Sequence, residues 1–292
     1  MFLPMRCFDA HSLRQAGTDV AEKTGIAWTT HTWSPWIGCT EVSPGCDHCY
    51  ARELDKRHRY GGAVHWGAGV PRYRTKQWDQ PIKWDKKAAA SGERAFVFPS
   101  LCDPFDNEVP EEWRSDLFDL IWKTQNLTWL LLTKRIGNVV KITGWNQPAS
   151  AWPNVWLGAS VVNPDEAARD LYKLRDTPAA KRFVSYEPAL ALIDWTPYLS
   201  FIDWLIVGGE SAQGGALARP FDLAWARATV AQCKAASVAC FVKQLGSNPE
   251  PTADETSPLG RAIREGGYRL KDRAGADPAE WPEDLRVQEF PN

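Results

Sequence analysis

Residues 155–186 have the sequence VWLGASVVNPDEAARDLYKLRDTPAAKRFVSY, in which two apolar runs flank one helical segment. The runs at 155–161 and 182–186 are short and apolar at successive positions, as is typical of parallel strands covered on both faces. Between them, Asn163 precedes Pro164 and Glu166 follows three residues after Asn163, which favours the start of a helix that reaches Leu174. The segment therefore predicts a strand, a helix and a second, parallel strand.

The same alternation continues on both sides of this segment. Further apolar runs lie at 95–98, 129–132, 204–209 and 239–244, and helical patterns lie at 110–123 and from Asp222 towards Cys233. With the segment that leads into Cys39, about seven β/α units are present. We predict an α/β fold: a (β/α) barrel or partial TIM-like barrel over residues 25–246, with extensions at 1–24 and 247–292.

Composition limits the classes of function. The chain has 292 residues and a net charge of −2, so a nucleic-acid contact would need a local basic patch. No apolar run is long enough to span a membrane. Seven cysteines without an export signal favour a reducing cytoplasm. The 16 tryptophans indicate core packing first, and stacking platforms for a base second.

Three cysteines lie within eleven residues, in the segment WIGCTEVSPGCDHCYA at 36–51. Thiolates are ligands for iron–sulfur clusters or zinc. Cys39, Cys46 and Cys49 would leave one iron of a four-iron cluster without a protein ligand, as a substrate-binding cluster requires. The alternatives are a structural zinc site completed by His31, His48 or His58, or three thiols that bind no metal.

Nearly every predicted strand ends in polar or reactive residues, and the carboxyl ends of barrel strands converge on one site. This indicates a shared site at that end of the barrel. The residues concerned are Ser100, Cys102, Asp103, Lys134, Arg135, Ser160, Ser185, Glu187, Glu210 and Lys243.

Together with LLTKR, PNVWLGASV, RFVSYEPAL and DWLIVGGES, the cysteine loop resembles a family of radical-SAM-like proteins associated with phages and bacteria. The resemblance implies a 4Fe–4S cluster on Cys39, Cys46 and Cys49, S-adenosyl-L-methionine, and a barrel of the radical SAM type. The chain departs from the usual radical SAM pattern in three ways. Six residues instead of three separate its first two cysteines, His48 stands where an aromatic residue is common, and Gly208-Gly209-Glu210 follows a late strand.

The resemblance also implies roles for the strand ends. Ser100 and Asp103 are assigned to the amino group of S-adenosylmethionine, and Ser160 and Glu187 to its ribose and methionyl groups. Tyr50 is a further cofactor contact. Cys102 is a candidate hydrogen-atom donor, although an inert buried thiol is the commoner state. The residues that would orient the substrate are Lys134, Arg135, Lys243 and Glu210. An electron donor such as flavodoxin or ferredoxin is implied.

Residues 52–76 contain seven Lys or Arg and two acidic residues, interleaved with aromatic residues. Charge with aromatics is typical of a nucleic-acid surface, although a solvated loop has the same composition. The phage association of the family that the chain resembles implies a host cytoplasm and rearrangement of an amino-acid group on a modified thymine in DNA, an isomerase-type reaction. The alternatives are a non-catalytic, zinc-stabilised nucleic-acid-binding protein and a radical SAM enzyme for a small molecule or protein. The predicted phosphate contacts are Arg57, Arg59, Arg72, Arg74 and Lys76, and the predicted stacking residues are Tyr60, Trp66 and Tyr73.

Overall fold

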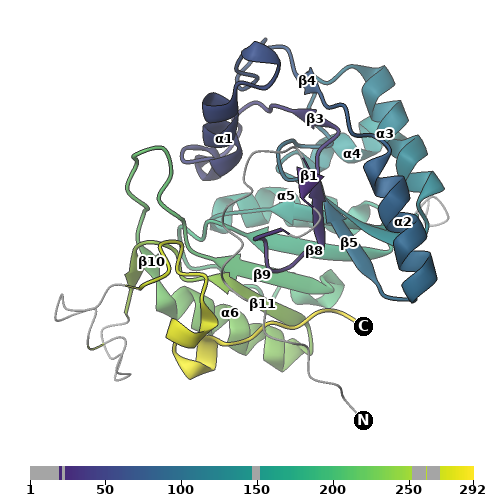
Figure 1. The fold of residues 1–292 in the computed structure, drawn as a ribbon. Helices are drawn as coiled ribbons and strands as arrows, with labels where there is room; N and C mark the ends of the chain where they lie inside the picture. Colours follow the sequence, from purple (N-terminus) through teal and green to yellow (C-terminus); the bar gives the residue numbers. More distant parts are fainter. Residues whose placement is uncertain (1–19, 22–23, 147–151, 252–260, 262–269) are drawn as a thin grey trace.

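The computed structural model describes residues 20–21, 24–146, 152–251, 261 and 270–292. Its centre is one sheet with the strand order β1-β2-β5-β6-β7-β8-β9-β11, curled into a half barrel (Figure 1). β1 is antiparallel to β2, and the seven strands from β2 to β11 are parallel. The predicted α/β fold with a partial barrel is confirmed. The strands are β1 (Val20–Ala21), β2 (His31–Trp33), β5 (Ala95–Phe98), β6 (Leu127–Thr133), β7 (Val155–Ser160), β8 (Lys181–Tyr186), β9 (Trp204–Gly208) and β11 (Ala239–Gln244).

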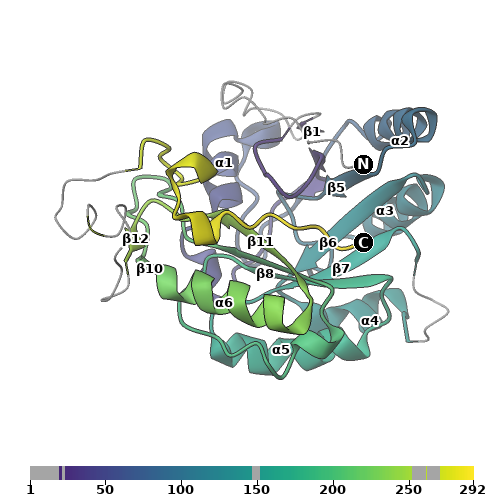
Figure 2. The same cartoon turned by 90° about the horizontal axis from the view of Figure 1, so that it is seen from below.

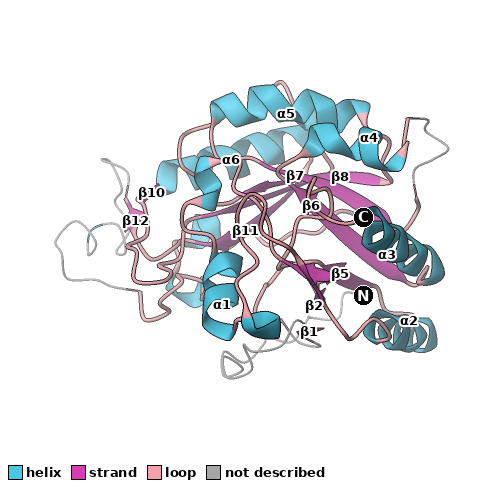
Figure 3. Cartoon of the chain, turned by 90° about the horizontal axis from the view of Figure 1, so that it is seen from above, coloured by secondary structure: helices cyan, strands magenta, loops and turns pink. Residues whose placement is uncertain are grey.

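Helices cover the outer, convex face of this sheet (Figure 2 and Figure 3). α2 packs on β5 and β6, α5 on β7, and α6 on β9 and β11. The helices predicted from 110, 163 and 222 are confirmed, and Asn163 caps α5 by accepting from the Glu166 backbone N–H at 2.9 Å. The helices are α1 (Tyr50–His58), α2 (Gln80–Ser91), α3 (Glu111–Lys123), α4 (Val139–Thr143), α5 (Pro164–Asp176) and α6 (Leu223–Ala236).

Short elements complete the described part of the chain. β3 (Trp36–Ile37) pairs antiparallel with β4 (Tyr73–Arg74), which ties the cysteine loop to the basic segment. β10 (Phe221–Asp222) pairs with β12 (Pro249–Glu250). None of the helices described has the length and apolar character needed to cross a membrane. The 3-10 helices are Pro44–Cys46, Tyr60–Gly62, Ile136–Asn138, Leu199–Phe201, Pro278–Glu280 and Glu283–Leu285.

The strands are apolar on both faces because the sheet has a core on each side. Successive strand residues point to opposite faces, so Val155 and Leu157 pack under the helices while Trp156 faces the concave side. The concave core consists mainly of aromatic side chains near the amino ends of the strands, among them Trp204 and Phe241. Most of the tryptophans are buried, which confirms packing as their main role.

A late segment of the chain closes the open edge of the sheet. Val242 donates its N–H to the Val287 carbonyl at 2.8 Å, and Glu289 donates to the Cys240 carbonyl at 2.9 Å. Phe290 then places its ring 5.1 Å from the ring of Trp204, so it packs on the concave core from outside and stays 37% exposed. Part of the predicted carboxy-terminal extension is therefore packed against the half barrel.

Candidate functional site

The concave face changes character along the strands. Trp156, Phe183 and Trp204 face the concave side near the amino ends of β7, β8 and β9. On the same face, nearer the carboxyl ends, lie Gly158 and Ser160 of β7, Ser185 of β8 and Gly208 of β9. A Cβ atom at Gly158 would lie only 2.3 Å from the Phe183 ring, so no larger residue fits there. Aromatic rings thus close the amino end of the half barrel, whereas small and polar groups line its carboxyl end.

The cysteine loop lies across this carboxyl end. Gly38, with a φ of 118°, forms a bridge with Cys102 just after β5, and a Cβ at this glycine would meet the His65 carbonyl oxygen at 2.2 Å. Pro44–Cys46 forms a 3-10 turn, and Cys49 donates its N–H to the Cys46 carbonyl at 3.2 Å before α1 begins. The three thiols of the sequence motif are therefore on one folded loop above the strand ends.

Glu210, after β9, holds this loop in place. Its carboxylate lies 2.8 Å from His48 Nδ1 and 2.5 Å from Arg219 Nη2, and Arg219 Nη1 also donates to the Pro44 carbonyl at 2.9 Å. Burial alone raises the pKa of Glu210, but hydrogen bonds from Arg219 and His48 outweigh it and lower the pKa. The Glu210 carboxylate thus bonds to His48 and Arg219, and its role in orienting a substrate stays a prediction.

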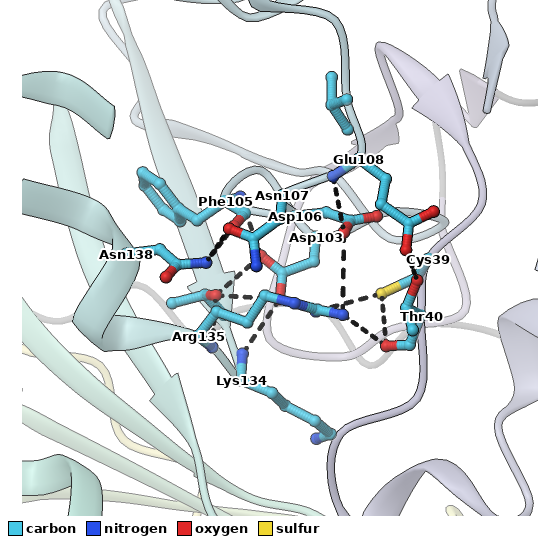
Figure 4. A network of polar contacts seen from close by, with 12 residues as sticks. Cys39, Thr40, Asp103, Phe105, Asp106, Asn107, Glu108, Lys134, Arg135 and Asn138 are labelled. Carbon is cyan, nitrogen blue, oxygen red and sulfur yellow. Dashed lines mark hydrogen bonds and ion pairs between the residues drawn. The ribbon is translucent and has the colours of Figure 1, made fainter. Parts of the chain in front are cut away.

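A second network fixes Cys39 (Figure 4). Arg135 donates to Cys39 Sγ at 3.4 Å and to Asp103 Oδ2 at 2.9 Å. Asp103 also accepts from the Thr133 hydroxyl at 2.7 Å and from the backbone N–H groups of Phe105 and Lys134 at 2.9 and 3.2 Å. Both carboxylate oxygens of Asp103 accept hydrogen bonds within the protein, and its assignment to the cofactor's amino group stays a prediction.

Burial raises the pKa of two of the loop's thiols, those of Cys39 and Cys49. Burial, reinforced by the charge of Asp103, raises the pKa of Cys39 to about 12. Burial also raises the pKa of Cys49, and the neighbouring Cys46 adds to this effect. Metal binding would displace the protons of these thiols, so metal affinity would rise with pH.

Most of the other predicted residues do gather at the carboxyl end. Lys134 Nζ donates to Ser160 Oγ, and Lys243 Nζ lies 2.8 Å from Glu187 Oε1. Tyr50 donates its hydroxyl to the Ser100 carbonyl at 2.6 Å. Cys102 lies beside them, and burial raises the pKa of its thiol well above the ordinary value. Ser100, Lys134, Ser160, Glu187 and Tyr50 are thus brought together around the cysteine loop.

The three thiols of the cysteine loop are donors of the type that an iron–sulfur cluster needs, although their side chains do not enclose a metal ion in this structure. In the described part of the chain, no three His, Cys, Asp or Glu side chains stand close enough to enclose a metal ion. Cys39, Cys46 and Cys49 are nevertheless on one loop, and thiolates are the ligands that iron–sulfur clusters use. Two of the three histidines of the zinc alternative have other contacts, since His31 stacks on Trp84 at 4.1 Å and His48 bonds to Glu210.

A family model described as "Protein of unknown function (DUF5131)" matches residues 23–272. The chain belongs to this family. The DUF5131 match includes the cysteine loop, all seven parallel strands and both networks that hold the loop. No curated protein and no solved structure matches the chain.

Within the DUF5131 region, the basic segment is partly structural. Arg72 is buried and lies 2.7 Å from Asp106 Oδ2, so the prediction that it contacts a phosphate is wrong for this arrangement. Arg74 is half-exposed, lies over Trp78 and pairs with Asp116 at 2.7 Å. The predicted stacking residues Tyr60, Trp66 and Tyr73 pack against a small core formed by Ile37, Ala51 and Leu101. The exposed cations of the predicted set are Arg57, Arg59 and Lys76.

Two residues of the networks around the cysteine loop were not predicted from the sequence. Arg219 lies in a loop without a motif, 172 positions from its partner Asp47. Asp106 lies 34 positions from Arg72. His48 gave a usable signal, because a histidine inside a cysteine loop needs a partner, but the sequence did not indicate that the partner is Glu210.

Proposed function

We propose that this protein is a radical S-adenosylmethionine enzyme in which Cys39, Cys46 and Cys49 hold a 4Fe–4S cluster. One observation carries the proposal: three thiols lie on one loop across the carboxyl end of a parallel half barrel, which is where barrel enzymes place their active sites. When bound, the cluster and S-adenosylmethionine supply a 5′-deoxyadenosyl radical that takes a hydrogen atom from the substrate.

The chain's own residues would bind and orient the cofactor. Ser160 and Glu187 lie at the carboxyl ends of neighbouring strands, on the side of the loop. Glu187 Oε1 lies 3.0 Å from the position that a Cβ at Gly208 would occupy, so this glycine leaves room beside the carboxylate. The proposal assigns Glu187 to the hydroxyl or amino groups of the cofactor. A small electron carrier such as flavodoxin or ferredoxin would supply the electron.

Release of 5′-deoxyadenosine tests the reaction. Anaerobically reconstituted protein, given dithionite and S-adenosylmethionine, should release this nucleoside, and Glu187→Gln should lower the rate at least tenfold by weakening cofactor binding. Glu93→Gln is the matched control, because Glu93 is exposed in the segment between α2 and β5, at the amino end of the strands. Formation of S-adenosylhomocysteine instead would indicate methyl transfer and contradict the proposal.

For the substrate, we propose a modified thymine in DNA, with rearrangement of its attached amino-acid group. The exposed cations Arg57 and Arg59 end α1, the helix that begins directly after Cys49. A base inside a duplex cannot reach the strand ends, so it would have to be flipped out while cations hold the backbone.

DNA binding tests this substrate class. Arg57→Ala combined with Arg59→Asn should lower the salt dependence of binding by about two units of slope on a log–log plot, roughly one per phosphate contact. Asn suits position 59 because Arg59 has a φ of 45°, which Asn tolerates. Lys123→Ala, at the end of α3 and before the amino end of β6, should leave the slope unchanged. Equal slopes for all three proteins would favour a small-molecule or protein substrate.

A further inference from the structure

Two consecutive cations after β6 face the cysteine loop at different points. Arg135 Nη1 donates to Cys39 Sγ at 3.4 Å. Lys134 has its Cε 3.5 Å from the position that a Cβ at Gly45 would occupy, next to Cys46. The end of one strand thus brings one positive charge to the first cysteine and another to the turn that contains the second.

Contacts within the protein hold the guanidinium group of Arg135 in one orientation. Its guanidinium lies 2.9 Å from Asp103 Oδ2, and Nη2 donates to the Thr40 carbonyl at 2.5 Å. Both members of the Arg135–Asp103 pair are 8% exposed, and Asp103 raises the pKa of Arg135 against the opposing effect of burial. The guanidinium is therefore charged, and its N–H group points at the Cys39 sulfur.

Lys134 has a different environment. Its ammonium donates to the Ser160 hydroxyl, and in the part of the chain that is described no carboxylate pairs with it. The ammonium of a half-buried lysine without an acidic partner stabilises any negative charge placed beside it. The cysteine loop lies beside this side chain, since Lys134 Cε is 3.5 Å from the position that a Cβ at Gly45 would occupy, next to Cys46.

We propose that Arg135 and Lys134 set the reduction potential of the cluster, Arg135 through its hydrogen bond to Cys39 and Lys134 through its charge. This inference rests on the proposed function. Reduction adds one electron from an external donor, with no bond made or broken, and so adds one negative charge beside three thiolates. Donors to cluster sulfurs and nearby positive charges stabilise the reduced form more than the oxidised form, which raises the potential.

A redox titration followed by electron paramagnetic resonance tests this role, because a merely structural role would change iron content and leave the midpoint in place. Lys134→Met should keep the iron content of the wild type. At a fixed solution potential, it should lower the ratio of reduced to oxidised cluster about tenfold, a shift of about 59 mV to more negative values for a one-electron couple. Arg135→Lys, which keeps the charge but removes the planar donor, should shift the midpoint in the same direction.

The control is Lys123→Met, whose lysine ends α3 on the exposed surface, and its midpoint should equal that of the wild type. An unchanged midpoint in Lys134→Met with full iron overturns the inference and leaves the proposed function standing. Loss of iron from Lys134→Met also overturns it, since Lys134 would then hold the loop instead of tuning the cluster. A wild-type protein that binds no cluster overturns the proposed function itself.

Discussion

Cys46→Ala is expected to remove most of the iron from the reconstituted protein. Wild type should hold about four irons per chain, in a cluster with three protein ligands. Cys46 lies in the middle of the loop and is 8% exposed, and its backbone N–H bonds to the Ser43 carbonyl at 2.8 Å. Alanine keeps this backbone turn and removes only the sulfur, so two thiolates would remain for a cluster that needs three.

Iron and sulfide analysis, with visible absorption, measures this effect. Cys233→Ala is the matched control, because Cys233 is fully buried on α6, outside the loop, and its loss should leave the iron content unchanged. Equal iron in both variants would show that Cys46 is not a ligand. A colourless wild-type protein with one tightly bound zinc would instead support the zinc-stabilised alternative.

Arg72→Ala is expected to lower the free energy of unfolding by about 3–5 kcal/mol, because it leaves a buried carboxylate without its partner. The Arg72 side chain is 0% exposed and that of Asp106 is 1% exposed. Arg72 also donates to the Thr40 hydroxyl at 2.6 Å and to the carbonyls of Gly67 and Val70 at 3.0 and 2.8 Å. The substitution therefore removes a group that joins the cysteine loop to the basic segment.

Urea denaturation measures this loss, and a double variant identifies its cause. Arg72→Met with Asp106→Leu removes both charges, so it should recover much of the stability that Arg72→Ala loses. Arg74→Ala, at a half-exposed pair with Asp116, should cost less than about 1 kcal/mol. A loss from Arg72→Ala no larger than that from Arg74→Ala would contradict the buried-pair explanation.

The sequence predicted the strands and several helices because their signals are local. Apolar runs at successive positions identify strands with a core on both faces, and Asn163 with Glu166 marks the start of α5. Partners could not be predicted, because pairs such as Arg72–Asp106 and His48–Glu210 depend on how distant segments meet. For this reason the basic segment suggested an exposed surface, although Arg72 is buried.

The position of Phe290 also determines the order in which the half barrel can be assembled. Strands β5 to β9 are neighbours in the sheet in the order in which they follow one another in the sequence, but the Phe290 ring contacts Phe96, Trp204 and Phe241, which precede it by many residues. Contacts of such high sequence separation form late and slow folding. During synthesis, Phe96, Trp204 and Phe241 therefore lack this aromatic contact until Phe290 has left the ribosome.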